Sequence, residues 1–408
     1  MSESTASLEQ NIRLYPLYQV ASNFLPWLPL FFLYFNQYVS LSDALVIASA
    51  YYFGVFALEI PSGYLSDLYG RKPILILSAM FGAISYCVFL FATNLTTLVI
   101  GQCFLAGFFS FKSGSDTSLL YDSLLQLNRQ EEYAAHEAKA AKYAMLSLAA
   151  SGLIGGVVGY FSLDVPYMFA LVASLISLII CTRFYEPKQT IKAQTFLNQM
   201  RICIGSLRQP LLLWLFAYFV VAYSLEHIPA EFNQPYVKLL QSNWFGDTDT
   251  SAIVSGVVLA VSMLTGAFAV YISIPLQRKF GTPKLLMASL FIQSSIIAAM
   301  SIVLHPLVLF IVMFRNFAMA LTHAPMLSAI APHIASAQRA TYLSIQSLAG
   351  RLGFAVALYS LSTVQYVEIE NELAMTWPQL SFLLRTCLLV SVVLLLTMAL
   401  TSKRIPSS

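Results

Sequence analysis

The segment Gly63-Tyr64-Leu65-Ser66-Asp67-Leu68-Tyr69-Gly70-Arg71-Lys72 lies between two long apolar stretches of this 408-residue chain. Two glycines and three charged residues within ten positions are typical of a short turn. Apolar stretches like those on either side recur about a dozen times along the chain. The segment is therefore predicted to connect two hydrophobic helices.

The composition indicates the class of protein. Hydrophobic residues make up 58% of the chain and charged residues 10%, whereas soluble domains carry roughly 25% charged residues. A polytopic membrane protein is the ordinary class that fits. The net charge of +3 is too small to indicate a nucleic-acid partner. The five cysteines have no CxxC or Cys/His spacing, so neither a metal site nor any other cofactor is expected.

The apolar stretches predict an all-α fold with twelve transmembrane helices, because a helix crosses the hydrocarbon core in about 20 residues and satisfies its own backbone in lipid. The predicted spans cover residues 14–38, 44–66, 73–93, 97–121, 140–162, 166–184, 209–236, 251–275, 284–304, 307–330, 341–363 and 379–401.

The distribution of lysine and arginine predicts the orientation. Outside the spans, these residues gather with the termini on one side, and the opposite loops hold acids and one base, Lys238. The positive-inside rule then predicts that both termini are cytoplasmic, in the inner membrane of a bacterium. The basic segment 185–208 is expected to be a cytoplasmic linker between two six-helix bundles, residues 1–184 and 209–408.

The two halves are weakly similar to each other. The turn Gly63–Gly70 corresponds to Ile274–Gly281, where Arg278 stands in the place of Asp67. Lys112 in the fourth span and Arg315 in the tenth are also comparable. Such weak sequence similarity between the two halves is typical of transporters built from internal repeats.

The turn resembles the signature loop of the major facilitator superfamily, which joins the second and third helices of that family. The defining positions are filled, including Gly63, Asp67 and Gly70, and the arrangement of six plus six spans is similar over the whole chain. The resemblance implies two six-helix bundles, a central cavity for a small-molecule substrate, and alternating access by a rocker switch. We expect a monomer in the lipid bilayer.

The resemblance also implies a cytoplasmic gate. Asp67 would face the start of the eleventh helix, near Arg339–Tyr342, where an N-terminal dipole stabilises an acid. Arg71 would pair with Asp122 at the end of the fourth helix. Gly63 would allow close helix packing, and Gly70 a conformation unfavourable to other residues. In the alternative interpretation, Arg71 and Lys72 set only the topology.

Two positions depart from the pattern of proton-driven drug exporters in the family. Their arginine early in helix 4 corresponds to Gln102, and their Gly-Pro motif in helix 5 corresponds to the proline-free segment 152–159. Both departures weigh against a direct assignment to that subgroup. The glycines of 152–159 predict a face for close helix packing.

Ionisable residues at membrane depth are costly, so each is a candidate for function. Arg315 and Arg351 lie near the middle of their predicted spans and are candidates for substrate binding. Gln19 and Asn23 in the first span are candidates for hydrogen bonds to the substrate. Arg351, Gln19 and Asn23 would alternatively bond to neighbouring helices.

Two further groups are candidates for proton coupling. Lys112 and Asp116 are four residues apart and would share a helix face, with Glu59 at a similar depth. This cluster is either a structural salt bridge or a proton or substrate site.

Span seven carries the second group, Glu226, His227 and Glu231, toward its periplasmic end. Histidine side chains generally titrate near neutral pH. His227 would share a face with Glu231, while Pro229 predicts a bend. A solvated helix mouth is the alternative.

No GxSxG, HExxH or Walker A motif is present, so an enzyme is not predicted. The predicted buried bases are Lys112, Arg315, Arg351 and Arg385, and the predicted buried acids are Glu59, Asp116, Glu226 and Glu231. This balance favours an amphiphilic or zwitterionic substrate, moved by proton-coupled efflux. One alternative is uptake of an anionic nutrient or metal chelate anchored by the arginines. The other is a membrane sensor or scaffold that transports nothing.

Overall fold

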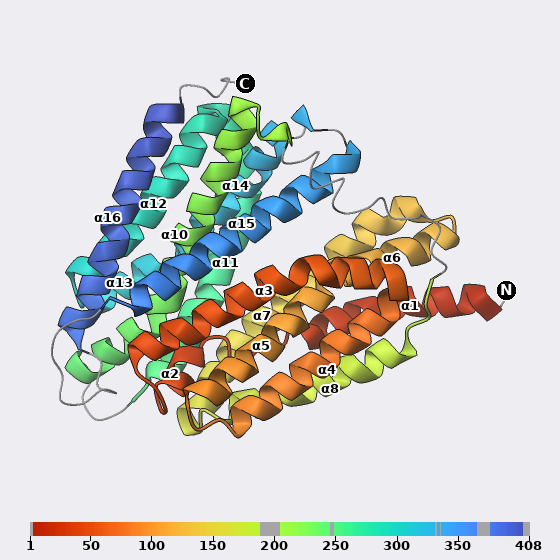
Figure 1. Ribbon diagram of the computed structural model, residues 1–408, viewed down its shortest axis with the longest axis horizontal. Coiled ribbons are helices and arrows are strands. Elements are labelled where there is room, and N and C mark those ends of the chain that lie inside the picture. Colours follow the sequence, from red (N-terminus) through yellow and green to blue (C-terminus); the bar gives the residue numbers. More distant parts are fainter. Residues whose placement is uncertain are drawn as a thin grey trace. The chain divides into compact units, whose positions relative to one another are not determined.

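The structure is a computed structural model that describes residues 3–187, 205–244, 249–330, 333–334, 336–364 and 376–402. Regular structure within these residues is helical (Figure 1). Most of the predicted linker lies outside the described residues. So do five of the basic residues on which the predicted orientation depends: Lys188, Lys192, Arg201, Lys403 and Arg404.

The chain divides into two compact units. The first contains the described residues through 187, apart from 40–45, which group with the second unit. The elements of the first unit are α1 (Glu3–Ser22), α2 (Phe31–Phe35), α3 (Leu41–Tyr69), α4 (Arg71–Leu90), α5 (Leu95–Lys112), α6 (Ser115–Gln126), the 3-10 helix η1 (Gln130–Glu132), α7 (Tyr133–Phe161) and α8 (Val165–Arg183). Those of the second are α10 (Pro210–Trp244), α11 (Ser251–Phe280), α12 (Thr282–Ile302), α13 (Pro306–Val312), α14 (Arg315–Ile330), α15 (Ser336–Ser362) and α16 (Trp377–Thr401).

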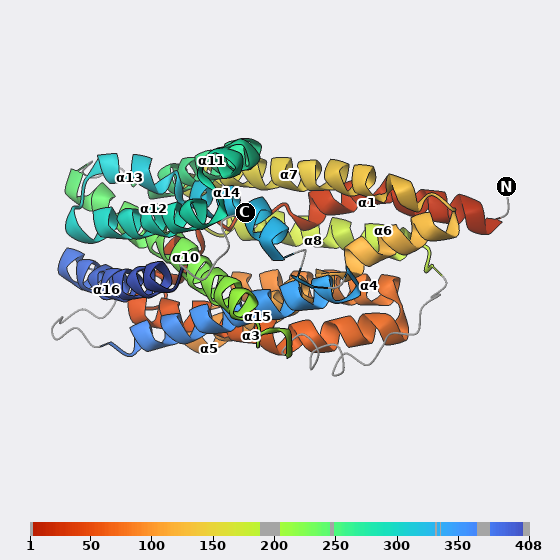
Figure 2. The ribbon, with the colours of Figure 1, turned by 90° about the horizontal axis from the view of Figure 1, so that it is seen from above.

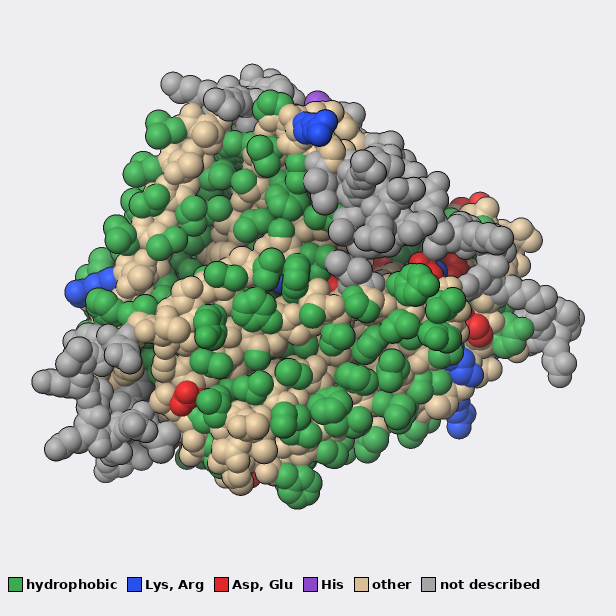
Figure 3. Space-filling view, in the orientation of Figure 1, with side chains coloured by type: hydrophobic (Ala, Val, Ile, Leu, Met, Phe, Trp, Pro, Cys, Tyr) green, Lys and Arg blue, Asp and Glu red, His purple; other side chains and the backbone are tan. Residues whose placement is uncertain are grey.

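Ten helical segments of the described chain are long and apolar enough to cross a membrane. Hydrophobic side chains cover much of the face seen in Figure 3, as expected for a surface in contact with lipid. The predicted spans 14–38 and 341–363 are not among the ten. The second of these falls on α15, which is 27 residues long but carries Gln346 and Arg351. The count of twelve spans therefore stays a prediction.

The first unit is built around α4, which packs against both α5 and α8. Small polar side chains allow the close approach: Ser78 Oγ donates to the Phe108 carbonyl at 2.6 Å, and Ser174 Oγ to the Ala79 carbonyl at 2.9 Å. In the second unit α11 packs against α14, and α12 against α16 (Figure 2). In each unit, the helices therefore pack against other helices of the same unit.

The first span is not the continuous helix predicted for residues 14–38. The helix α1 ends at Ser22, and an irregular segment precedes the short α2. Pro26 and Pro29 lie in this segment, and proline lacks the N–H that a helix requires.

The side chains of α7 support the irregular segment. Ser147 Oγ donates to the Val20 carbonyl, and the Leu25 N–H donates to Ser151 Oγ, both at 2.8 Å. A Cβ atom at Gly155 would overlap the carbonyl oxygen of Pro26. The predicted close-packing face of 152–159 is thus confirmed at Gly155.

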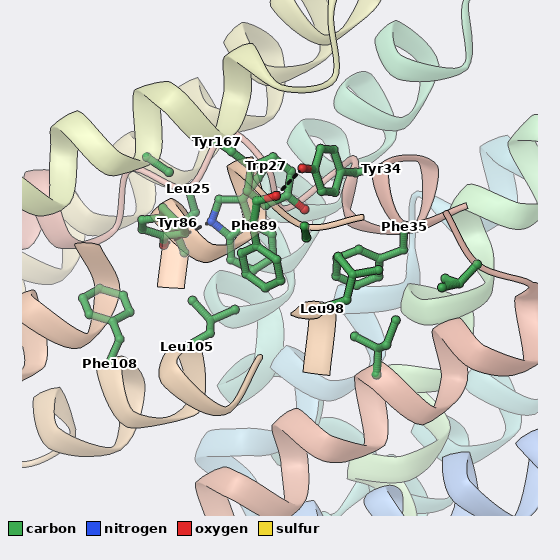
Figure 4. Packing of buried hydrophobic residues seen from close by; sticks show 14 residues of the cluster. Leu25, Trp27, Tyr34, Phe35, Tyr86, Phe89, Leu98, Leu105, Phe108 and Tyr167 are labelled. Atoms are coloured by element: carbon green, nitrogen blue, oxygen red, sulfur yellow. Dashed lines mark hydrogen bonds between the residues drawn. The ribbon is translucent and has the colours of Figure 1, made fainter. Parts of the chain in front are cut away.

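A cluster of aromatic rings fills the space beside the same segment (Figure 4). The Trp27 ring stacks on Tyr167 with centroids 6.1 Å apart, and Trp27 Nε1 donates to the Tyr86 hydroxyl at 3.2 Å. Tyr34 donates to the Phe89 carbonyl at 2.5 Å. These contacts join the broken first span to α4 and α8.

The predicted spans 97–121 and 307–330 are found at Leu95–Gln126 and Pro306–Ile330, but each is interrupted, which was not predicted. The first is interrupted between α5 and α6, where Gly114 has a φ of +74° in the left-handed region. The second is interrupted between α13 and α14, and Thr265 Oγ1 donates to the Met313 carbonyl there at 2.8 Å. Polar residues lie beside both breaks, Lys112–Asp116 at the first and Arg315 and Asn316 at the second, but each break is short enough to stay within one long apolar stretch.

The seventh span is longer than predicted. It was expected at 209–236, but α10 continues to Trp244 through Pro229 and Pro235. At 1.5 Å per residue, Glu226 lies about 24 Å from the beginning of α10 and about 27 Å from its end. The group Glu226–Glu231 is therefore near the middle of α10, and its position toward the periplasmic end of the membrane stays a prediction.

The contact between α7 and the irregular segment can be tested by adding one methyl group. Gly155→Ala should lower the free energy of unfolding by about 1–3 kcal/mol, because the new Cβ has backbone on its path. Gly63→Ala on α3 is the matched control, since its Cβ would meet no atom within 4 Å among the described residues. Thermal unfolding of the purified protein should show a lower midpoint for Gly155→Ala only. Equal midpoints would contradict this packing.

Candidate functional site

The loop between α3 and α4 is fixed by an acid that the sequence did not single out. The Glu186 carboxylate accepts hydrogen bonds from the N–H groups of Arg71, at 2.8 Å, and Lys72, at 2.7 Å. It thus caps the first turn of α4, where backbone N–H groups lack partners within the helix. Gly70 has a φ of +105°, and a Cβ there would lie 2.7 Å from the Glu186 carboxylate. Backbone conformation and space therefore both require glycine at position 70.

The Arg71 side chain connects three segments of the first unit. Its Nη1 lies 2.5 Å from Asp67 Oδ1 and 3.1 Å from Ser66 Oγ. Its Nε lies 3.4 Å from Asp122 Oδ2 on α6. The predicted contact between Arg71 and Asp122 is present, and it joins the loop to the end of the fourth span.

The predictions for Gly63, Lys72 and Asp67 are not confirmed in the way that the Arg71–Asp122 contact is. A Cβ atom at Gly63 would meet no atom within 4 Å among the described residues, so the close packing expected there is not found. Lys72 enters the cap through its backbone N–H. The expected contact of Asp67 with the start of α15 would join the two units, and it stays a prediction.

The corresponding loop of the second unit has the same backbone shape without the acid. Gly281 has φ 80° and ψ 154°, close to the 105° and 162° of Gly70. Gln277 Nε2 donates to Thr282 Oγ1 and to Ser328 Oγ, both at 3.0 Å. The repeat therefore preserves the turn but uses neutral hydrogen bonds where the first unit uses charges.

A polar cluster in the first unit lies between α1, α6 and α7. Gln19 Nε2 donates to Asp116 Oδ2 at 2.8 Å and to the Tyr15 hydroxyl at 3.0 Å. Tyr15 in turn donates to Glu137 Oε2 at 3.0 Å. Asn23 Nδ2 donates to Gln19 Oε1 at 2.9 Å. Gln19 therefore makes the hydrogen bond between helices that was one of its two interpretations, and its binding of substrate stays a prediction.

The expected cluster of Glu59, Lys112 and Asp116 has a different geometry. Lys112 ends α5 and Asp116 lies in the first turn of α6, so the expectation of one shared helix face is wrong. Lys112 is buried, with Nζ 5.9 Å from the centre of the Tyr18 ring. Glu59 accepts a hydrogen bond from Ser113 Oγ at 3.0 Å, at the interruption itself.

A second polar cluster lies in the second unit between α10 and α15, with a contribution from α14. His227 Nδ1 lies 3.2 Å from Glu226 Oε2 and 2.8 Å from the Tyr223 carbonyl oxygen. Both oxygens accept hydrogen bonds, so Nδ1 carries a hydrogen, and a further proton must be taken up at Nε2. The Tyr223 ring stacks on the imidazole with centroids 4.0 Å apart.

The two predicted substrate-binding arginines belong to this second cluster. Arg351 interacts electrostatically with Tyr223. Arg315, the first residue of α14, interacts electrostatically with Glu226. Residues that the sequence assigned to separate substrate and proton groups therefore lie together, and Glu226 is the carboxylate in contact with His227.

The structure differs from the sequence-based prediction at Arg385 and at four residues that were not predicted. Arg385 was expected to be buried, but it is exposed on α16. Arg385 lies eight residues after Trp377, the first residue of α16. Hydropathy alone does not show which face of this helix points outward. The long arginine side chain can extend toward the membrane interface. Tyr15, Glu137, Tyr223 and Glu186 were missed. Glu186 directly precedes Pro187 after the last helix of the first half, which is the one signal that could have identified it.

Comparison with known proteins identifies the family. A model of the Major Facilitator Superfamily matches residues 17–358. The chain belongs to this superfamily. It is a multi-pass membrane transporter of the all-α fold that the loop motif and the spans predicted.

A curated relative in the superfamily is the tetracycline resistance protein, class H, of Pasteurella multocida. It is 28% identical over 240 residues, which span 56% of each chain. Among solved structures, the nucleoside transporter NupG has a TM-score of 0.75 at 11% identity, over 98% of this chain and 99% of that one. The peptide transporter POT in complex with sulfate has a TM-score of 0.71 at 13% identity, over 97% and 95% of the two chains. Both structures share the fold.

The cap on α4 gives a direct test of the loop. Glu186→Ala should lower the free energy of unfolding by about 0.5–2 kcal/mol, as loss of a helix cap does. Glu131→Ala is the control, because Glu131 is exposed. Hydrogen exchange at the N–H groups of Arg71 and Lys72 should accelerate in Glu186→Ala alone. Unchanged exchange would contradict the cap.

Proposed function

We propose that this transporter exports a small amphiphilic or zwitterionic organic molecule across the bacterial inner membrane in exchange for protons, by alternating access. The observation that carries the proposal is the second polar cluster, where Arg315 of α14 and Arg351 of α15 interact electrostatically with residues around Glu226 and His227 of α10. Charges of both signs in one place suit a substrate that carries both signs. The match to a tetracycline resistance protein supports outward transport of an organic compound.

The contact between His227 and Glu226 supplies a reason for exchange. A cationic group of the substrate and an added proton at His227 Nε2 would both place positive charge beside the Glu226 carboxylate. Because like charges repel at short range, especially where water is scarce, the two would exclude each other. Release of one would then favour binding of the other. His227 suits this role, since imidazole titrates near neutral pH.

The first unit would supply the gate in this mechanism. The contacts of Arg71 with Asp67 and Asp122 support a latch on the side of the charged loop, which we place in the cytoplasm together with both termini. These contacts lie within the first unit, so they would hold the loop and Asp67 in position while the gate opens and closes. The polar cluster of Gln19 and Asp116 would hold α1, α6 and α7 together while the gate moves.

Flux measurements test the direction and the coupling. Proteoliposomes loaded with a labelled zwitterionic amphiphile should lose it faster when diluted into acidic buffer than into buffer of equal pH. Glu226→Gln should abolish the dependence on the pH gradient, and Glu131→Gln should leave it intact. Accumulation of an anionic substrate driven by inward proton flow in right-side-out vesicles would favour uptake. Absence of flux for every compound in a broad screen would favour a sensor or scaffold.

The proposed gate has its own test. Asp67 is 41% exposed in its contact with Arg71, so Asp67→Asn should change the free energy of unfolding by no more than about 1 kcal/mol. Transport should nevertheless fall sharply if the acid acts in opening and closing. Flux, expression and the thermal midpoint should be measured on the same preparation. Flux equal to that of the unmodified protein would remove Asp67 from the gate.

A further inference from the structure

The second unit contains an apolar cavity of about 440 Å³ between α10, α15 and α16. This volume is within the range of roughly 300–1,000 Å³ that small-molecule sites occupy. Its wall includes Leu225 and Ile228 of α10, Phe354 and Ala357 of α15, and Cys387 and Val390 of α16. A group that enters this cavity must therefore be a hydrocarbon or nearly so.

The cavity shares a wall with the charged cluster. Phe354 lines the cavity, and its ring centre lies 5.3 Å from that of His227 and 6.5 Å from that of Tyr223. Leu225 and Ile228 directly flank Glu226 and His227 in the sequence. A molecule with its charged end at Glu226 would thus find apolar surface immediately beside it.

The shape of the cavity favours an elongated group. Its lining extends from residue 220 to 228 on α10 and from 353 to 361 on α15. At 1.5 Å per residue each range corresponds to about 12 Å along its helix.

We propose that this cavity binds the hydrocarbon portion of the transported amphiphile while Glu226, His227 and Arg351 bind its polar head. This inference rests on the proposed function and adds the chemical class of the substrate: a single-chain amphiphile with a zwitterionic head. A membrane phospholipid is a different occupant. Its head group remains at the membrane interface, whereas the charged residues beside this cavity lie about midway along α10.

Photolabelling of the full chain in lipid nanodiscs tests the inference. The probe is an alkylphosphocholine that carries a diazirine at the end of its chain. Labelled peptides should map to residues 353–364 and 386–394. Ala357→Phe should reduce this labelling by about tenfold or more, because the added ring excludes several methylene groups from the cavity.

The matched control is Val356→Phe, one residue earlier on α15. Val356 is 49% exposed and does not line the cavity, so labelling should persist there. Arg351→Gln should also reduce labelling, because the head group loses its anchor. Thermal midpoints near that of the unmodified protein establish that the variants are folded.

Several outcomes would overturn the inference. Labelling confined to exposed positions outside these ranges, such as Leu396 and Leu400, and equal in Ala357→Phe, would indicate ordinary contact with the bilayer. Labelling that is insensitive to Arg351→Gln but suppressed by a phospholipid with the same chain would assign the cavity to a membrane lipid.

The inference and the proposed function can fail separately. Cavity labelling without any flux in proteoliposomes would reject export and retain the binding site. Flux of a short-chain zwitterion, together with long-chain labelling that Ala357→Phe does not change, would reject only the cavity site.

Discussion

A chain that crosses a bilayer must satisfy its backbone hydrogen bonds within the protein, since lipid offers no partner. This constraint explains why the interruptions of the helices are accompanied by specific polar side chains. Ser151 accepts from the Leu25 N–H at the break in the first span. Thr265 donates to the Met313 carbonyl at the break in the tenth. Side-chain hydrogen bonds thus stabilise the backbone at these breaks. Lys112 and Arg315 lie directly beside two of the interruptions.

The two units use their buried charges in different ways. In the first unit Gln19 and Tyr15 donate the hydrogen bonds that Asp116 and Glu137 accept, and the buried Lys112 adds one electrostatic interaction with Asp116. In the second unit acids, arginines and an imidazole lie together around Tyr223. Neutral donors suit a permanent connection between helices, whereas opposite charges beside a titratable ring suit exchange of ligands. This contrast is why the proposed binding site is assigned to the second unit.

Composition and one loop motif were sufficient to predict the class of protein and its superfamily, because both depend on residue type alone. The contact of Arg71 with Asp122 could also be predicted, since it follows the motif. The sequence could not predict that Gly114 interrupts the fourth span, or that Arg385 is exposed. Nor could it predict that Glu226 and Arg315, 89 positions apart, interact electrostatically. These features depend on packing between helices, which hydropathy does not encode.

The position of Glu186 has a consequence for where this protein can be divided. The predicted boundary of the first half, at residue 184, follows the end of its last apolar stretch. The carboxylate that caps α4 lies beyond that boundary, although it contacts the first half alone among the described residues. A separately expressed first half that stops at 184 would lack this cap, whereas one that continues through Pro187 would retain it. Assembly of the protein from two separately expressed halves should therefore depend on residues 185–187, which lie outside the predicted transmembrane spans.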